Sequence, residues 1–162
     1  MPRTSEITVQ PPLGPLLLRA DEQGMTEVRF VRNPCRRGKA SALLRTAQEQ
    51  IRASFAGTRR TFSLPLHIRG TAFERAVWRA LARVPYGTVV TYGELAREIG
   101  KPRAMRAVGT ALRKNPLAIL LPCHRVIPSR GGTGRYAGGA WRKAWLIAHE
   151  KQCVQRREKQ GK

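Results

Sequence analysis

The fold is decided between residues 71 and 116, which read TAFERAVWRALARVPYGTVVTYGELAREIGKPRAMRAVGTALRKNP. Thr71 and Thr91 each stand three residues before a glutamate, which is the spacing of a capping box at the start of a helix. Apolar residues follow both boxes at helical spacing. Pro102 suits the first position of a further helix, which Asn115-Pro116 then stops. The stretch therefore predicts a helix-turn-helix unit, built from short helices joined by a tight, glycine-containing turn.

Upstream, residues 7–31 hold short apolar runs separated by prolines and glycines, a pattern typical of two or three antiparallel strands. An amphipathic helix ending at Gly57 is predicted by apolar residues that recur every four positions, at Leu43, Ala47, Ile51 and Phe55. Residues 64–68 return to strand-like alternation. We therefore expect an α+β protein, with a small N-terminal antiparallel-sheet and helix domain over residues 1–70. A mostly helical, winged-helix-like domain containing the helix-turn-helix follows over residues 71–150.

Downstream, the apolar run at residues 117–121 is too short for a typical helix, and we expect a strand that delivers Pro122-Cys123-His124-Arg125 at its end. Five glycines within residues 129–139 predict a loop. A last helical face ending at Glu150 is predicted from Trp141, Ala144, Trp145 and Ala148. Residues 151–162 form a polar, basic C-terminal tail that we expect to be disordered.

The charge balance is strongly basic, with 31 Lys and Arg against 10 Asp and Glu, a net charge of +21 and a pI near 11.6. No acidic residue lies between Lys101 and His149, whereas ten basic residues do: Lys101, Arg103, Arg106, Arg113, Lys114, Arg125, Arg130, Arg135, Arg142 and Lys143. This distribution favours a polyanionic partner bound by the C-terminal half. A solvated basic surface without a partner is the alternative.

The cysteines argue against metal and disulfide frameworks. Cys35, Cys123 and Cys153 are an odd number, widely spaced, without a CxxC pair or a histidine cluster. We expect no metal and no cofactor. Because no apolar run approaches the ~18 residues that span a bilayer, we also expect no membrane partner and a cytoplasmic, nucleoid-associated protein.

Cys123 and His124 are the first candidate for chemistry. A cysteine is nucleophilic as its thiolate, so a neighbouring imidazole and an electropositive site that lowers the thiol pKa suit that role. Glu150 is the first carboxylate after Glu98 and could orient His124 as the third member of a relay. The alternatives are a buried core cysteine, a structural histidine and an exposed glutamate at a helix end.

The order of several motifs resembles the O6-alkylguanine-DNA alkyltransferase family. They are Arg106-Ala107-Val108-Gly109, Asn115-Pro116, Pro122-Cys123-His124-Arg125-Val126-Ile127 and Tyr136-Ala137-Gly138-Gly139, with Leu13-Gly14-Pro15-Leu16 near the start. The similarity runs from about Phe73 to Glu150. It implies single-turnover DNA repair, in which an O6-alkylguanine (or O4-alkylthymine) is flipped out of double-stranded DNA. The alkyl group passes irreversibly to the protein's own cysteine, and the protein binds as a monomer in the minor groove.

The resemblance also implies a catalytic group of four residues. Cys123 matches the alkyl acceptor, and His124 matches the general base that activates it through a water molecule. Glu150 matches the carboxylate that orients the histidine. Tyr92 matches the tyrosine whose hydroxyl stabilises the departing guanine.

Further positions are implied to contact DNA or substrate. Arg106 matches the finger that fills the space left by the flipped base, and small Ala107 and Gly109 let its helix approach the groove closely. Asn115 matches a hinge between the recognition helix and the acceptor segment. Substrate contacts are implied for the backbone of Val126 and for the loop containing Arg135 and Ala137. Where some members have a serine, Ala137 offers only its backbone N–H.

Two other classes of protein stay open. A lesion sensor with the same fold would bind damaged DNA without transferring the group, but such members replace the cysteine, whereas Cys123 is present. A turnover cysteine hydrolase would need an oxyanion hole and would not need so much positive charge. An ester-hydrolysis assay separates that class from the others.

Overall fold

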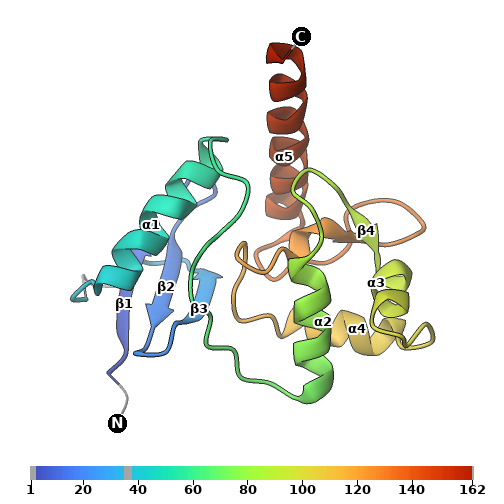
Figure 1. Ribbon diagram of the computed structural model, residues 1–162, viewed down its shortest axis with the longest axis horizontal. Helices are drawn as coiled ribbons and strands as arrows, with labels where there is room; N and C mark the ends of the chain where they lie inside the picture. The colour runs from blue at the N-terminus through green and yellow to red at the C-terminus, as the bar shows by residue number, and fades with distance from the viewer. Residues whose placement is uncertain (1–2, 35–37, 162) are drawn as a thin grey trace. The chain divides into compact units, whose positions relative to one another are not determined.

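The computed structural model describes residues 3–34 and 38–161, and the chain divides into two compact units (Figure 1). The first unit runs to Arg69 and also includes residues 116–120, which the sequence assigned to the second domain. The second comprises residues 70–115 and those from Leu121 onward. One unit carries an antiparallel sheet and the other is mostly helical, so the expected α+β class is confirmed.

The first unit is a three-stranded sheet covered by one helix. Strands β1 (Ser5–Val9), β2 (Leu16–Ala20) and β3 (Met25–Phe30) are antiparallel in that order, as predicted. Helix α1 (Ala42–Phe55) packs on β1 and β2 and buries Ala47 and Ile51 of the predicted face, whereas Leu43 and Phe55 are only half-buried. Residues 64–68 form no strand: Leu66 makes only an isolated bridge to Met25, because the neighbouring Pro65 has no N–H to donate.

The second unit begins with the two predicted capping boxes. Helices α2 (Ala72–Ala82) and α3 (Tyr92–Glu98) each start with both capping hydrogen bonds formed. Helix α4 (Met105–Arg113) starts later than expected. Pro102 instead occupies the second position of a turn, in which the Ala104 N–H donates to the Lys101 carbonyl at 2.9 Å. That position of a β-turn suits the fixed backbone angle of proline.

The apolar run before Cys123 is not the strand that the sequence predicted. Leu117 bridges Val28 in the first unit, and Ile119 then turns the chain with a positive φ of 72°. Residues Cys123–Arg125 form the short 3-10 helix η1. Two short strands that the sequence did not reveal, β4 (Val90–Thr91) and β5 (Val126–Ile127), pair in parallel beside it.

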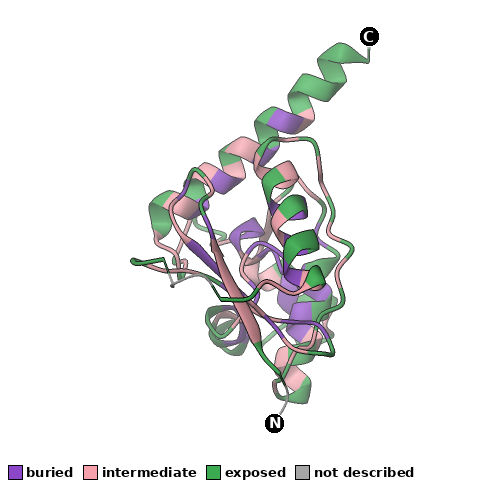
Figure 2. Ribbon diagram, turned by 90° about the vertical axis from the view of Figure 1, so that its left-hand side faces the viewer, coloured by how far each residue is buried: buried purple, intermediate pink, exposed green. Residues whose placement is uncertain are grey.

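The last helix differs most from expectation. Helix α5 (Ala140–Gln160) continues through most of the tail that was expected to be disordered. Its buried residues are Lys143, Leu146, Glu150 and Cys153, whereas the predicted face lies largely in solvent, with Trp141 59% exposed. Figure 2 shows that most of α5 is exposed or intermediate, with few buried positions. Polar groups of α5 are buried because they belong to the site described below. Although α5 has 21 residues, no helix within residues 3–34 and 38–161 is long and apolar enough to cross a membrane.

Candidate active site

A cavity of about 530 Å³ lies within the second unit, between α4, the start of α3, η1 and the glycine-rich loop before α5. Its lining includes six of the residues expected to contact substrate or DNA, namely Tyr92, Arg106, Gly109, Cys123, Arg135 and Ala137. The loop around residues 129–139 contains no regular element, as predicted. Segments distant in the sequence therefore bring the candidate nucleophile and several basic side chains to one hollow.

The other expected residues lie outside the lining. His124 and Glu150 are buried next to the cavity, with 1% and 5% of their surfaces exposed. The side chain of Asn115 hydrogen-bonds the Cys123 thiol. Val126 is fully buried in β5 and does not line the cavity. Ala107 is exposed on α4 and does not line the cavity.

The Cys123 thiol lies in a mixed environment. Burial raises its pKa, while the Asn115 side chain, the Lys143 charge and nearby backbone N–H groups act to lower it. The net result is a raised pKa, so the expectation of a site that lowers it is wrong. Asn115 is held in place because its amide also donates to the Leu121 carbonyl at 2.9 Å. At neutral pH the resting thiol is therefore protonated, and Cys123 needs a base before it can act as a nucleophile.

A buried carboxylate lies against the histidine. Glu150 Oε1 is 2.7 Å from His124 Nε2. Burial alone would raise the pKa of Glu150, but hydrogen bonds from His124 and Arg125 outweigh it and lower the pKa to about 2. Glu150 is therefore ionised at neutral pH.

The ionised carboxylate fixes the tautomer of the imidazole. Burial lowers the pKa of His124 despite the opposing effect of Glu150, so the ring is neutral. Its single proton then belongs on Nε2, which faces Glu150, and Nδ1 carries the lone pair. Nδ1 is buried and has no hydrogen-bond partner among the residues that the structure describes. The ring can thus accept a proton at Nδ1 while Glu150 stabilises the resulting cation.

Arg125 completes a buried cluster with His124 and Glu150, although sequence reasoning assigned it no role beyond its charge. Its Nε and Nη2 each donate to Glu150 at 2.9 Å, and its Nη1 donates to the Val84 carbonyl at 2.7 Å. The Gly87 N–H adds a fourth donor to the carboxylate at 3.1 Å. The pairing joins residues 25 positions apart, so no local pattern could reveal it.

Lys143 is a second residue that sequence reasoning missed. It is 1% exposed, and its Nζ donates to the Arg135 carbonyl at 3.3 Å and lies 5.9 Å from the centre of the Tyr92 ring. Burial lowers the pKa of Lys143, while Cys123 acts to raise it. A lysine so deeply buried next to a cysteine places positive charge where a thiolate would form.

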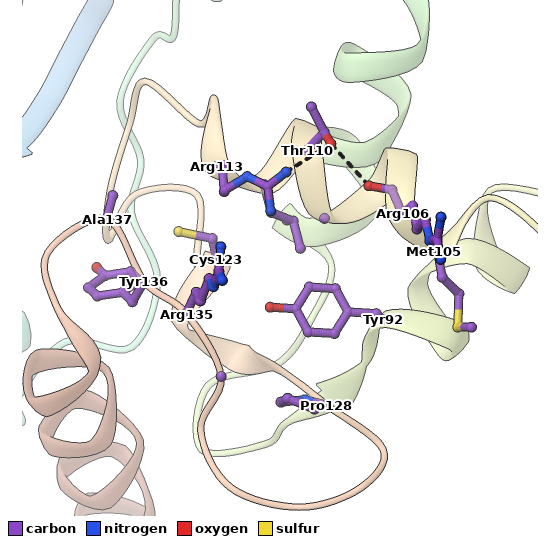
Figure 3. Close-up of a pocket in the computed structure, with 13 residues that line it drawn as sticks. Tyr92, Met105, Arg106, Thr110, Arg113, Cys123, Pro128, Arg135, Tyr136 and Ala137 are labelled. Atoms are coloured by element: carbon purple, nitrogen blue, oxygen red, sulfur yellow. Dashed lines mark hydrogen bonds between the residues drawn. The ribbon is translucent and has the colours of Figure 1, made fainter.

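Two tyrosines flank the cysteine. Figure 3 shows the Tyr92 hydroxyl pointing from the start of α3 toward Cys123, with Tyr136 and Ala137 on the other side. Burial raises the pKa of Tyr92, so its hydroxyl is protonated and can donate. At the rim, Arg106 is exposed on α4, and the Thr110 hydroxyl that donates to its carbonyl accepts from Arg113.

Two family models match the chain. One is described as 6-O-methylguanine DNA methyltransferase, DNA binding domain, and matches residues 72–152. The other is described as 6-O-methylguanine DNA methyltransferase, ribonuclease-like domain, and matches residues 6–68. Together they cover most of both units.

Curated proteins and solved structures agree with these matches. A methylated-DNA–protein-cysteine methyltransferase of Methanosarcina acetivorans is 42% identical over 148 residues, covering 88% of this chain and 95% of the relative. One from Mycolicibacterium paratuberculosis is 43% identical over 150 residues, covering 90% and 91%. The crystal structure of Mycobacterium tuberculosis O6-methylguanine methyltransferase superposes with a TM-score of 0.84 at 38% identity, covering 93% of this chain and 94% of that one. A structure of the M. tuberculosis protein OGT in complex with DNA gives 0.83 at 40% identity, covering 90% and 92%.

Proposed function

The chain belongs to the 6-O-methylguanine DNA methyltransferase family and acts as a methylated-DNA–protein-cysteine methyltransferase, and we propose that Cys123 is the cysteine that receives the alkyl group. The observation that carries this assignment is its position: Cys123 lines the cavity together with Tyr92 and Arg106. Cys153 is buried on α5 and does not line it. Cys35 lies outside the described residues.

The transfer forms a bond from Cys123 Sγ to the alkyl carbon and breaks the bond from that carbon to O6 of guanine. The thiol must lose its proton, because its pKa is raised by burial. His124 takes this proton at Nδ1 through a water molecule, and Glu150 stabilises the imidazolium that forms. The alkylated sulfur is a thioether that has no route back to a thiol, so each chain reacts once.

The departing guanine needs its developing negative charge stabilised. Tyr92 supplies a protonated hydroxyl at the cavity wall, which donates to a ring nitrogen of the base. The backbone N–H of Ala137 and the backbone of Val126 contact other edges of the guanine. Because alanine has no hydroxyl, the Ala137 contact is made by the main chain alone.

Access to the alkyl carbon requires base flipping, because that carbon is shielded within a duplex. We assign the exposed Arg106 as the side chain that fills the vacated stack, with α4 in the minor groove. The groove offers little sequence information, which suits repair of lesions in any sequence. A monomer bears the complete site, since every catalytic residue assigned above belongs to one unit of one chain.

Peptide mapping tests the acceptor directly. The protein is reacted with duplex DNA carrying isotopically labelled O6-methylguanine, digested and analysed by tandem mass spectrometry. We expect the label on Cys123, with transfer abolished in Cys123→Ala and unchanged in Cys35→Ala and Cys153→Ala. Label on either of the other cysteines would overturn the assignment. Duplex affinity of Cys123→Ala should stay within a few-fold, because the basic surface supplies binding.

A further inference from the structure

Arg125 is the one charged residue of the buried cluster to which the transfer mechanism gives no part. It is 7% exposed, and all three of its guanidinium nitrogens donate hydrogen bonds within the protein. These bonds and its burial hold the guanidinium inside the protein, away from a DNA-binding surface. The guanidinium also lies 5.4 Å from the centre of the Tyr86 ring, which further fixes its plane.

The key contact is a shared oxygen. Glu150 Oε1 accepts from His124 Nε2 at 2.7 Å and from Arg125 Nη2 at 2.9 Å. A carboxylate that faced the histidine alone would favour the imidazolium, because an opposite charge at this distance stabilises the charged form. A histidine that is already protonated on both nitrogens cannot accept the proton of the thiol.

We propose that Arg125 is a positioning residue that keeps His124 in its neutral, proton-accepting form by neutralising the charge of Glu150. This proposal rests on the proposed function, since it takes His124 as the base. The charged groups that act on His124 are Glu150 and Lys143 from α5 and Arg125 from η1. Burial lowers the pKa of His124 most, Glu150 raises it, and Arg125 and Lys143 lower it again.

Arg125 gives the relay a charge compensation that a Cys-His-Glu triad alone would lack. With Arg125 present, the cluster of Glu150 and Arg125 carries no net charge before the reaction. The imidazole therefore stays neutral at physiological pH, and the carboxylate still orients it through Nε2. Removing the guanidinium leaves the Glu150 carboxylate as an unpaired buried anion beside His124. The His124 ring then takes a proton from solvent before the Cys123 thiol can supply one.

The test is the pH dependence of Cys123 alkylation by free O6-benzylguanine, which requires no DNA binding. Single-turnover rates are measured by intact mass for the wild type, Arg125→Gln and Arg125→Lys. For Arg125→Gln we expect the acid limb of the rate profile to move upward by about 1–3 pH units, with the rate recovering at alkaline pH. Arg125→Lys keeps the cation and should restore a profile close to wild type.

Two further variants make the test specific. Arg83→Gln removes an arginine that also pairs with a glutamate in this unit, Glu98 at 3.4 Å, but at the surface, and its profile should match wild type. The double variant Arg125→Gln/Glu150→Gln removes both buried charges, so it stays measurable if Arg125→Gln does not fold. In that double variant, NMR titration of the ring should show His124 protonating at no higher pH than in the wild type.

The outcomes separate the two levels of the argument. A rate loss in Arg125→Gln by the same factor at every pH, or a His124 in the double variant that protonates at higher pH than in the wild type, overturns the role of Arg125 alone. An Arg125→Lys profile shifted as far as that of Arg125→Gln does the same, because charge would then not matter. A His124→Gln variant that reacts at the wild-type rate overturns the base assignment and this proposal with it.

Discussion

Replacing Glu150 by glutamine tests the buried cluster through stability. The glutamine keeps the size of the side chain but removes the charge that accepts from His124, from Arg125 twice and from the Gly87 N–H. Its NH₂ group also faces a donor of Arg125. Because the guanidinium would then be buried without an anion, we expect the free energy of unfolding to fall by about 3–5 kcal/mol.

The pKa of Glu150 gives an independent measure of the same interaction. A shift from the ordinary 4.5 to about 2 corresponds to about 3 kcal/mol of stability. The folded-state pKa is the lower one, so this stability is fully present above pH 4.5 and is lost as the pH falls toward 2. The difference between wild type and Glu150→Gln should therefore shrink over that acid range.

Urea unfolding at several pH values measures both effects, with Glu98→Gln as the matched control. Glu98 pairs with Arg83 at 3.4 Å, but its side chain is 59% exposed, so its removal should cost less than about 1 kcal/mol. If Glu150→Gln is destabilised no more than Glu98→Gln at neutral pH, the carboxylate does not hold the cluster together and the reasoning fails.

Three other predictions concern the reaction itself. Tyr92→Phe removes one hydrogen-bond donor to the departing guanine, and such a donor is typically worth ~2.7–4 kcal/mol in the transition state. The single-turnover rate should therefore fall by about 10²–10³ with duplex affinity unchanged, and an unaltered rate would exclude this role for Tyr92. Arg106→Ala should slow repair in duplex DNA more than the reaction with free O6-benzylguanine, and equal slowing would remove Arg106 from the finger role. Methylated protein should melt at a lower temperature than unmodified protein, because the thioether accepts hydrogen bonds from Asn115 more weakly than the sulfur it replaces. The added carbon also overpacks the site, which should lower the free energy of unfolding by on the order of 1–3 kcal/mol. An equal or higher melting temperature after removal of the product DNA contradicts this prediction.

The parts of the fold that local chemistry determines were predictable. The capping boxes at Thr71 and Thr91 predict where α2 and α3 begin, because their hydrogen bonds join residues only three positions apart. The paired strands β4 and β5 were not predictable in the same way. Each has two residues, and their parallel pairing joins positions 36 apart, so neither shows a periodic pattern.

The orientation of α5 shows why the pattern of apolar and polar residues mispredicts the buried face of a helix near a reactive site. Hydrophobic periodicity assigns Trp141 and Trp145 to the buried face, yet the helix buries Lys143 and Glu150 instead. Both polar groups find partners there, which offsets the cost of their burial. Those partners lie on η1 and in the glycine-rich loop, so only the tertiary structure reveals them.

The candidate site, too, was predictable only in part. The motif residues around Cys123 and the position of Tyr92 could be assigned by resemblance, and the structure places both at one cavity. The protonation state of the resting Cys123 thiol could not be predicted from the sequence. A count of basic residues suggests a lowered pKa, but burial depends on packing and outweighs the nearby charges.

The intact mass of the protein after mixing with duplex DNA that contains O6-methylguanine tests the central claim most directly. Stoichiometric transfer to Cys123 predicts a mass increase of one methyl group per chain, no further increase with excess DNA, and unmodified guanine in the recovered oligonucleotide. Cys123→Ala should show no increase. Catalytic demethylation without a change in the protein's mass, or methylation that persists in Cys123→Ala, would contradict the account.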